Sequence, residues 1–372
     1  MSYTKIVLVG GGTGGHFYPL IAIAESLREI DTPVDLYYFG PDAYDEKALA
    51  KHGISFMSVP AGKRRRYFSF YNYIDIVKTF FGLCVAVVKL YWIYPDVVVS
   101  KGGYTSVPVV LAAAFLRIPI VIHESDAKMG SANRLAMRFA RAVVIAYEDL
   151  AVSLTHAQMY TLGIPIRKAL QSPISSNAHV TFNISNSLPV ILVIGGSQGA
   201  ERINDFILDS LEELLPEYNI IHQTGRSHYD LCVRSADTLI QDEAIRARYH
   251  PVAYLDDVGM NDVYHLAHVV ISRAGSNSIY EIAVHGKPSI IIPIPEDVSH
   301  DQRTNAYAYA RSGAAVVIEE KNMSDDLLRS EIDRIMQDVE VYAQMSASAQ
   351  SFGKQNSANE VASLIIDIAK QH

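Results

Sequence analysis

The chain has 372 residues. Because this is more than usually fold around a single hydrophobic core, the length predicts about two domains. A composition of 49% hydrophobic and 19% charged residues excludes a disordered protein. The two cysteines exclude a disulfide framework and indicate a reducing cytoplasm, and a formal net charge of −8 argues against a nucleic-acid partner.

Strand and helix patterns alternate along the chain. The N-terminus leads directly into a buried strand, so we expect no signal peptide. Buried strands are predicted at 6–9, 36–39, 97–100, 120–123, 143–146, 190–194, 220–223, 269–272, 289–293 and 315–318. Helices are predicted between them, as at 15–30, 107–116 and 204–215. This alternation predicts an α/β fold with parallel sheets that helices cover on both faces.

A segment without clear periodicity separates two halves of different charge. Residues 171–188 are rich in Ser, Asn and Pro, which is typical of a linker. We expect one domain at 1–166 and a second at 167–372, with a final helix at about 356–370 that could pack back on the first domain. The first carries 16 Lys and Arg against 13 Asp and Glu, whereas the second carries 16 against 27.

Two glycine-rich turns of similar form lie about 185 residues apart. The first occupies 10–15 and the second 195–200, and each lies between a buried strand and the start of a helix. Such a turn directs backbone N–H groups and the positive helix end at an anion, usually a phosphate. The pair therefore predicts two Rossmann-like domains that face a central cleft, each binding a part of the ligand.

The first turn also satisfies the Gly-x-Gly-x-x-Gly pattern of dinucleotide-binding proteins, at Gly10, Gly12 and Gly15. That pattern needs an acidic residue at the end of the second strand to bind a ribose. Here Asp42 comes only after a proline turn, and no residues for hydride transfer accompany it. We therefore expect no nicotinamide or flavin, and no other cofactor.

One dense basic run lies in the first half, at 63–66, and is followed by aromatic residues and a long apolar stretch. The stretch at 79–94 is too short for a membrane span and contains Lys89. Basic side chains beside aromatic and aliphatic ones are typical of a surface that binds anionic lipid headgroups. The alternative is a solvated loop before a core helix.

The second half contains two further motifs that suit a nucleotide-sugar. After the strand at 269–272, three small polar residues at 276–278 can cap a helix and bind a phosphate. Glu281 follows within two turns, where it could accept hydrogen bonds from ribose hydroxyls or be a solvated helix residue. The Gln and Asn within 301–306 could bind sugar hydroxyls, although the aspartate there could equally cap a helix.

Seven segments carry a resemblance to a known family over nearly the whole chain. They are GGGTGGHFYP (10–19), KGGYTSVPVVLAA (101–113), IPIVIHESDAKMGSANRLA (118–136), GIPIR (163–167), GGSQGA (195–200), SRAGSNSIYEIA (272–283) and DQRTNA (301–306). In order and spacing the sequence resembles the MurG family, N-acetylglucosaminyltransferases of bacterial peptidoglycan synthesis. The resemblance implies a GT-B fold, with the acceptor bound by the first domain and the UDP-sugar by the second.

The resemblance also implies the reaction and its setting. It implies transfer of GlcNAc from UDP-GlcNAc to the muramyl sugar of lipid I, the undecaprenyl-diphosphate-linked precursor, which gives lipid II. It implies a peripheral location on the cytoplasmic face of the membrane, with the anionic inner leaflet as a binding surface. Other cell-wall synthesis proteins, with roles in cell shape and division, are candidate partners.

On the acceptor side, the resemblance makes His16 the candidate general base. The other candidate contacts are Thr13, Gly14, Gly15, Gly103 and Tyr104. The common His-Glu-Gln-Asn segment of the family is here His-Glu-Ser-Asp at 123–126, so an amide has become the carboxylate of Asp126. Asp126 is therefore the competing candidate for the base.

On the donor side, the resemblance implies a longer set of contacts. They are Arg167, Ser197, Gln198, Leu255, Arg273, Gly275, Ser276, Asn277, Ser278, Glu281 and Gln302. Arg167 and Ser197 would contact the diphosphate and nucleotide, and Leu255 would bind the uracil through its backbone. The common Arg-Ser-Gly is here Arg-Ala-Gly at 273–275, which removes one hydroxyl.

The residues themselves suit glycosyl transfer to a C4 hydroxyl, which needs a proton acceptor and stabilisation of a leaving diphosphate. A histidine with the usual pKa of about 6.5 suits the first task, although His16 could instead be a structural residue at a helix start. Helix N-termini with Arg167 can stabilise the leaving charge. No Asp-x-Asp pattern occurs, so we expect metal-independent, inverting transfer.

Two other classes of function stay open. One is another GT-B enzyme, such as a glycolipid glycosyltransferase or a UDP-GlcNAc epimerase. An epimerase would need neither an acceptor nor a basic, apolar surface. The other is a non-catalytic scaffold that binds a nucleotide-sugar, which is disfavoured because both halves carry residues suited to chemistry.

Overall fold

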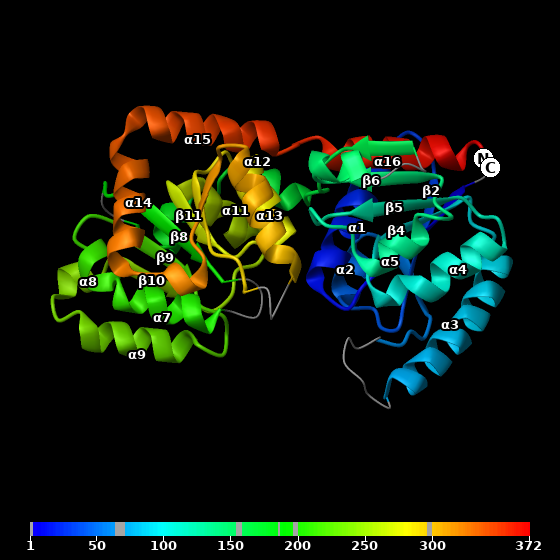
Figure 1. Ribbon diagram of the computed structural model, residues 1–372, viewed down its shortest axis with the longest axis horizontal. Coiled ribbons are helices and arrows are strands. Elements are labelled where there is room, and N and C mark those ends of the chain that lie inside the picture. The colour runs from blue at the N-terminus through cyan, green and yellow to red at the C-terminus, as the bar shows by residue number, and fades with distance from the viewer. Residues whose placement is uncertain (1–2, 64–70, 154–157, 185–186, 196–199, 296–299) are drawn as a thin grey trace. The chain divides into compact units, whose positions relative to one another are not determined.

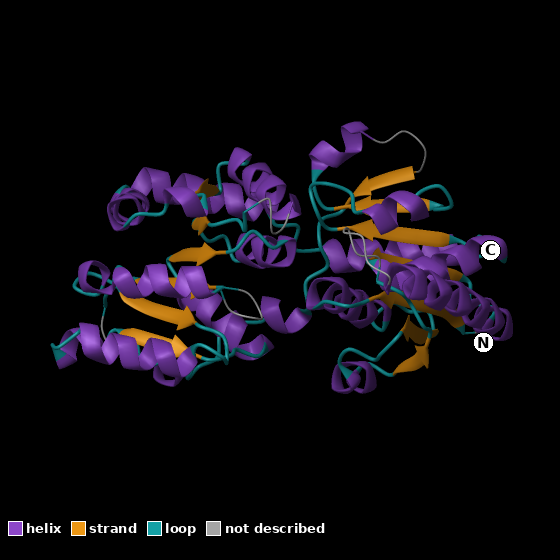
Figure 2. Cartoon of the chain, turned by 60° about the horizontal axis from the view of Figure 1, so that its bottom comes forward, coloured by secondary structure: helices purple, strands orange, loops and turns teal. Residues whose placement is uncertain are grey.

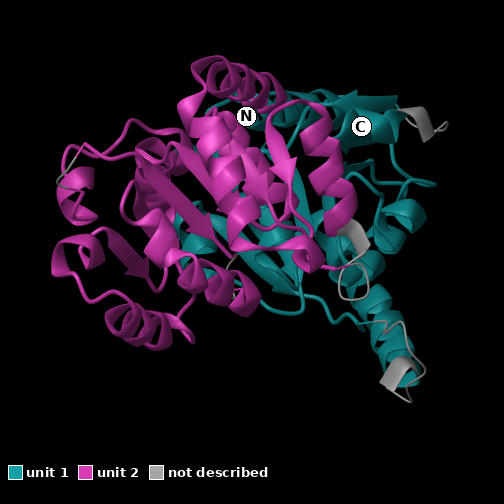
Figure 3. Ribbon diagram, turned by 60° about the vertical axis from the view of Figure 1, so that its left-hand side comes forward, with its two compact units in different colours: residues 1–168, 355–372 teal, residues 169–354 magenta. Residues whose placement is uncertain are grey.

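The structure is a computed structural model that describes residues 3–63, 71–153, 158–184, 187–195, 200–295 and 300–372 (Figure 1). Two parallel β-sheets form its framework, and helices flank each of them (Figure 2). The chain divides into two compact units, Met1–Lys168 with Gln355–His372 and Ala169–Lys354 (Figure 3). The predicted α/β class with two parallel sheets is confirmed.

The sheet of the first unit has seven strands in the order β3-β2-β1-β4-β5-β6-β7, and all neighbouring pairs are parallel. The strands are β1 (Thr4–Gly10), β2 (Val34–Gly40), β3 (Ile54–Ser58), β4 (Val97–Gly102), β5 (Ile120–Glu124), β6 (Ala142–Ile145) and β7 (Gln158–Thr161). The helices are α1 (Gly14–Leu27), α2 (Glu46–Lys51), α3 (Tyr71–Ile93), α4 (Val107–Phe115), α5 (Ser131–Ala136) and α16 (Ser357–Ala369).

Two apolar layers hold this first sheet. On one face α1 packs against α16, so that Leu20 and Ile23 share a core with Val361 and Ile365. On the other face, the core includes residues of α3 and α4, which pack against each other. The C-terminal helix therefore completes the core of the unit that contains the N-terminus.

The sheet of the second unit has six parallel strands in the order β10-β9-β8-β11-β12-β13. The strands are β8 (Val190–Ile194), β9 (Asn219–Gln223), β10 (Tyr249–Val252), β11 (Val269–Ser272), β12 (Ser289–Ile291) and β13 (Ala315–Val317). The helices are α6 (Ala178–Thr181), α7 (Glu201–Asp209), α8 (Leu211–Leu214), α9 (Tyr229–Leu239), α10 (Glu243–Arg246), α11 (Asp257–Leu266), α12 (Ser276–Val284), α13 (His300–Arg311), α14 (Asp325–Gln337) and α15 (Val339–Phe352).

One predicted helix is divided in the structure. The helix expected at 204–215 is present as α7 and α8, with Ser210 between them. The hydroxyl of Ser210 hydrogen-bonds to Phe206 O at 2.9 Å and to Asp325 Oδ1 at 2.7 Å. A serine that bonds back to the preceding turn competes with the helical backbone, which accounts for the interruption.

Helix α3 corrects an expectation about the apolar stretch in the first half. We expected the stretch at 79–94 to be too short for a membrane span, but the helix is longer, and Tyr73–Ile93 is long and apolar enough to cross a membrane by length and composition only. It is the one such helix among the residues that the structure describes. Ala86 and Leu90 nevertheless lie in the core of the first unit, so one side of α3 belongs to the domain.

One buried and two half-buried histidines should make the second unit sensitive to acid. Burial lowers the pKa of His222 to about 3 and those of His250 and His285 to about 4. Below the ordinary pKa of about 6.5 the unfolded chain binds protons that the folded unit does not, so the free energy of unfolding should fall as the pH drops toward 4. For the fully buried His222 this loss is about 2 kcal/mol between pH 6.5 and 5. Urea unfolding midpoints that do not change with pH would contradict this expectation.

Candidate active site

The first glycine turn connects β1 to α1 and is packed too tightly for side chains. The hydroxyl of Tyr38 donates a hydrogen bond to Gly10 O, and a Cβ at Gly11 would lie 2.7 Å from that hydroxyl. A Cβ at Gly12, whose φ is +85°, would lie 2.9 Å from the ring of Tyr104. Glycine is therefore required here by space at Gly11 and by backbone conformation at Gly12.

His16 lies in the first turn of α1, beside the loop that follows β4. Its Nδ1 is 2.9 Å from Thr13 Oγ1, and its ring lies 3.8 Å from the Cβ position of Gly103. Desolvation, and then the charge of Lys101, lower the pKa of His16 to about 4, while Asp126 acts in the opposite direction. The imidazole is therefore neutral at pH 7 and can accept a proton.

The acceptor-side residues that the sequence predicts gather at one edge of the first sheet. Parallel strands place the loops after their carboxyl ends at the same edge. After β1, Thr13 is the N-cap of α1 and the first turn of that helix contains Gly14, Gly15 and His16, while Gly103 and Tyr104 follow β4. Asp126 follows β5 and interacts electrostatically with His16.

A buried carboxylate organises the loop after β5. Glu124 accepts hydrogen bonds from Asp126 N at 3.1 Å, Gly130 N at 2.9 Å and Asn133 Nδ2 at 3.1 Å. Burial and then the nearby Asp126 raise the pKa of Glu124, while Lys101 and the two backbone N–H groups act to lower it. These bonds fix the path of the chain through Asp126.

Three residues of this cluster were not among the sequence-predicted site residues, namely Lys101, Glu124 and Asn133. Lys101 is 1% exposed at the end of β4, directly after four buried residues. A lysine at the end of an apolar strand was the sequence signal that could have identified it. Nothing in the sequence alone distinguishes Asn133.

In the second unit, most of the predicted donor residues follow β8, β11 and β12, which are neighbours in the sheet, whereas Leu255 follows the edge strand β10. Ser197 and Gln198 lie outside the described residues. Gly275 precedes α12, and residues 276–278, which are Ser276, Asn277 and Ser278, form its first turn. Gln302 of α13 accepts a hydrogen bond from Ile294 N at 3.3 Å. The backbone N–H groups at the start of α12 thus lie on the edge where α/β proteins bind nucleotides.

Glu281 is held in place by a buried tyrosine. The hydroxyl of Tyr264, a residue without exposed surface, donates a hydrogen bond to Glu281 Oε2 at 3.2 Å. The Tyr264 ring stacks on His285 with 4.7 Å between the ring centroids, and His285 Nδ1 lies 2.7 Å from Glu281 O. The carboxylate is therefore oriented by its surroundings, unlike that of a solvated helix residue.

Three other predicted donor residues have well-defined surroundings. Arg273 is buried after β11, and its Nη1 lies 2.5 Å from Glu320 Oε1. Leu255 is buried directly before Asp256, the N-cap of α11. Arg167 belongs to the first unit, where its guanidinium carbon lies 4.3 Å from the centre of the Tyr18 ring.

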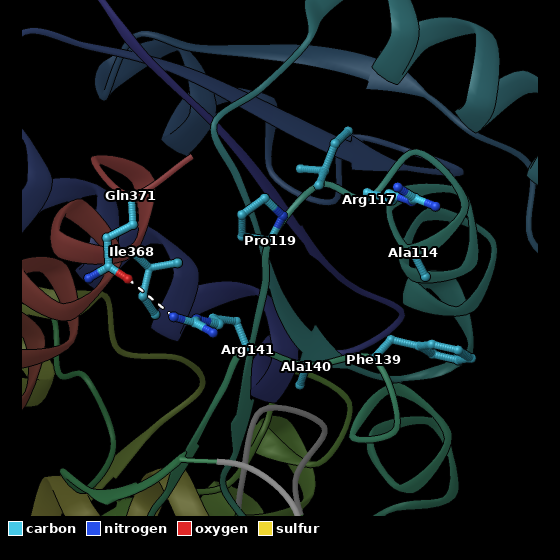
Figure 4. A pocket seen from close by; sticks show the side chains of 9 residues that line it. Ala114, Arg117, Pro119, Phe139, Ala140, Arg141, Ile368 and Gln371 are labelled. Atoms are coloured by element: carbon cyan, nitrogen blue, oxygen red, sulfur yellow. Dashed lines mark hydrogen bonds between the residues drawn. The ribbon is translucent and has the colours of Figure 1, made fainter.

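The first unit also contains a separate cavity of about 520 Å³ (Figure 4). It lies at the end of the sheet opposite to the candidate acceptor residues. Its lining residues are Ala114, Arg117, Ile118, Pro119, Phe139, Ala140, Arg141, Ile368 and Gln371. Pro119 and Arg141 precede β5 and β6, so the cavity is at the amino ends of these strands. None of the residues predicted for the site lines it.

Both halves of the chain match known protein families. The glycosyltransferase family 28 N-terminal domain matches residues 6–145, and the glycosyltransferase family 28 C-terminal domain matches residues 190–362. The chain is 35% identical over 369 residues to the UDP-N-acetylglucosamine--N-acetylmuramyl-(pentapeptide) pyrophosphoryl-undecaprenol N-acetylglucosamine transferase of Lachnospira eligens, covering 98% of this chain and 99% of the relative. The similarly named protein of Treponema denticola is 34% identical, covering 87% of this chain and 85% of the relative.

Solved structures support the fold. MurG of Acinetobacter baumannii superposes with a TM-score of 0.75 at 22% identity, covering 98% of this chain and all of that one. The UDP-GlcNAc 2-epimerase of Neisseria meningitidis superposes with a TM-score of 0.70 at 13% identity, covering 99% of this chain. The GT-B-like fold is thereby confirmed, and the full-length relatives identify the chain as a UDP-GlcNAc-dependent glycosyltransferase. The chain belongs to the MurG family of N-acetylglucosamine transferases.

Proposed function

We propose that this enzyme transfers GlcNAc from UDP-GlcNAc to the C4 hydroxyl of the MurNAc of lipid I, with inversion at the anomeric carbon, giving lipid II. The observation that carries the proposal is 35% identity along 98% of the chain to a relative whose name states this donor and acceptor. The first unit (1–168 with 355–372) binds the acceptor, and the second (169–354) binds the donor.

On the acceptor side, His16 acts as the general base. With Nδ1 bonded to Thr13 Oγ1, Nε2 is the ring nitrogen that takes the proton from the C4 hydroxyl. The hydroxyl oxygen then forms the bond to C1 of GlcNAc as the bond from C1 to the UDP oxygen breaks. A pKa of about 4 keeps the ring neutral but makes it a weak base, so Asp126 remains the competing candidate.

On the donor side, the start of α12 stabilises the leaving diphosphate. Backbone N–H groups at residues 276–278 and the positive end of the helix are fixed donors for phosphate oxygens. Glu281 accepts hydrogen bonds from the ribose hydroxyls, with its orientation set by Tyr264. Ser197 and Gln198, outside the described residues, would complete the nucleotide contacts.

The second candidate is a GT-B enzyme without this acceptor, such as a UDP-GlcNAc epimerase. The observation that favours this alternative is the similar fold of a UDP-GlcNAc 2-epimerase. Release of UDP should be measured with UDP-GlcNAc alone and with an added lipid I analogue. Strict dependence of UDP release on the analogue supports the transferase. Conversion of UDP-GlcNAc to its C2 epimer without acceptor would favour the alternative.

The enzyme binds the membrane peripherally through α3. Several apolar side chains of α3 are largely exposed, among them Phe80 at 66% and Trp92 at 82%. Lys63 precedes this helix and is exposed, whereas Arg64, Arg65 and Arg66 lie outside the described residues. Because Ala86 and Leu90 pack in the domain core, α3 lies along the membrane surface in this proposal, which places the first unit near a lipid-linked acceptor.

Changing Phe80 and Phe81 together to serine should weaken binding to phosphatidylglycerol-containing vesicles by about 100-fold or more, since each buried aromatic ring contributes about 1.5–3 kcal/mol. Changing Arg64, Arg65 and Arg66 to alanine should weaken it by roughly 100-fold at low salt, at about 1 kcal/mol for each residue. The matched control is Val180→Ser with Val339→Ser, because both valines are exposed in the second unit. Vesicle sedimentation that gives the same binding for all variants would contradict the assignment.

A further inference from the structure

The acceptor site of the first unit contains a buried lysine with no hydrogen-bond partner. Lys101 is 1% exposed, and within the described part of the chain its Nζ bonds to no other group. Three other buried polar atoms near the ends of β4 and β5 are likewise unbonded among described residues, namely Thr105 Oγ1, His123 Nδ1 and Asn133 Oδ1. Buried polar atoms usually have partners, so a group of such atoms needs an explanation.

Lys101 lies directly against the first glycine turn. A Cβ at Gly10 would be only 2.7 Å from Lys101 Cβ, so the base of the lysine side chain packs against the turn that leads to His16. The ammonium group interacts electrostatically with His16, Glu124 and Asp126. Lys101 is thus a buried charge close enough to the candidate base and both nearby carboxylates to interact with them.

Packing alone does not explain a lysine at this position. A buried ammonium without a hydrogen bond lowers stability, and an unbranched apolar side chain would fill similar space without that effect. Burial lowers the pKa of Lys101 to about 8, with Glu124 and Asp126 acting in the opposite direction, so the group still carries its proton at pH 7. Residues that lower stability in this way are typical of functional sites.

We propose that Lys101 is a positioning residue for the acceptor site, whose buried, unpartnered ammonium holds the candidate base His16 in its neutral form as the pH falls. The inference rests on the proposed function, because it assigns Lys101 an effect on the proposed base. Tyr38 and Tyr104, which also line the glycine turn, have raised pKa values and stay neutral over this range. Among the described residues, the charged groups that interact with His16 are therefore Lys101 and Asp126.

The test is the pH dependence of Lys101→Met. Loss of the positive charge removes one cause that lowers the pKa of His16, so that pKa should rise. The acidic limb of the kcat/KM profile should then move to higher pH by about 0.5–1 unit. Asp126→Asn should move the limb in the opposite direction, and the double variant should return it toward that of the unmodified enzyme. The melting temperature of Lys101→Met should be unchanged or raised, because an unpartnered buried charge is removed.

Lys287→Met is the matched control, because burial also lowers the pKa of Lys287, but this residue lies in the second unit. It should leave the acidic limb unchanged.

The His16 imidazole should also be titrated by NMR, with its resonance identified by its absence in His16→Ala. A raised His16 pKa without a shift in kcat/KM would support the role of Lys101 and remove His16 as the base. An unchanged His16 pKa in Lys101→Met, or loss of folding in both Lys101→Met and Lys101→Gln, would overturn the proposal.

Discussion

Replacing His16 with alanine should lower kcat by about 10²–10⁴-fold, the usual contribution of general acid–base catalysis, and leave donor affinity nearly unchanged. His16 is in the first turn of α1, where its Nδ1 is bonded to Thr13 and its pKa is low enough to keep it neutral. The donor is bound by residues of the second unit in our proposal, so a change at His16 should affect the chemical step. Steady-state kinetics with saturating UDP-GlcNAc and a lipid I analogue measure this effect.

His52→Ala is the control for the His16 variant, because His52 is in the same unit but lies 3.5 Å from Glu25, away from the glycine turn. It should keep normal kcat. The competing assignment is tested by Asp126→Asn, which keeps the shape of the side chain. Near-normal kcat in His16→Ala together with loss of activity in Asp126→Asn would transfer the role of base to Asp126.

Glu281→Ala should raise the KM for UDP-GlcNAc by roughly 10- to 150-fold, because loss of a hydrogen bond to a charged group corresponds to about 1.5–3 kcal/mol. The kcat at saturating donor should change much less, since the ribose is remote from the bond that breaks. Tyr264→Phe should raise KM in the same direction but less, because it removes only the bond at 3.2 Å that orients the carboxylate. Melting temperatures of both variants check that the second unit stays folded.

Two control variants test whether an effect on KM is specific to Glu281. Glu360→Ala removes an exposed carboxylate in the first turn of α16, in the other unit, and should leave KM unchanged. Tyr309→Phe removes a buried hydroxyl that has no hydrogen-bond partner among the described residues, and should also leave KM unchanged. An unchanged donor KM in Glu281→Ala would remove this residue from the binding site.

The central strands could be predicted from sequence, but most edge strands could not. All ten predicted strands are present, because strands buried on both faces, such as β1 and β8, contain continuous apolar runs. The three that were missed, β3, β7 and β10, lie at sheet edges, where one side has no neighbouring strand. Their exposed or polar residues, including His250 and Pro251 in β10, interrupt the apolar pattern.

The parts of the candidate site that could be predicted from sequence are those where the backbone conformation requires particular residues. The glycines after β1 mark a turn in which side chains do not fit, and the position of His16 follows from that turn. The role of Lys101 was not predictable, because burial of its ammonium depends on how β4 packs between β1 and β5. The support that Tyr264 gives Glu281 depends in the same way on packing between α11 and α12.

The most direct test of the proposed reaction is the structure of its product. The purified enzyme should be incubated with UDP-GlcNAc and a lipid I analogue, and the lipid product analysed by mass spectrometry and NMR. We expect one added GlcNAc, β-linked to the C4 oxygen of MurNAc, with one UDP released for each product formed. An α linkage, attachment at another hydroxyl, or a change in UDP-GlcNAc with the lipid analogue left unmodified would contradict the proposed function.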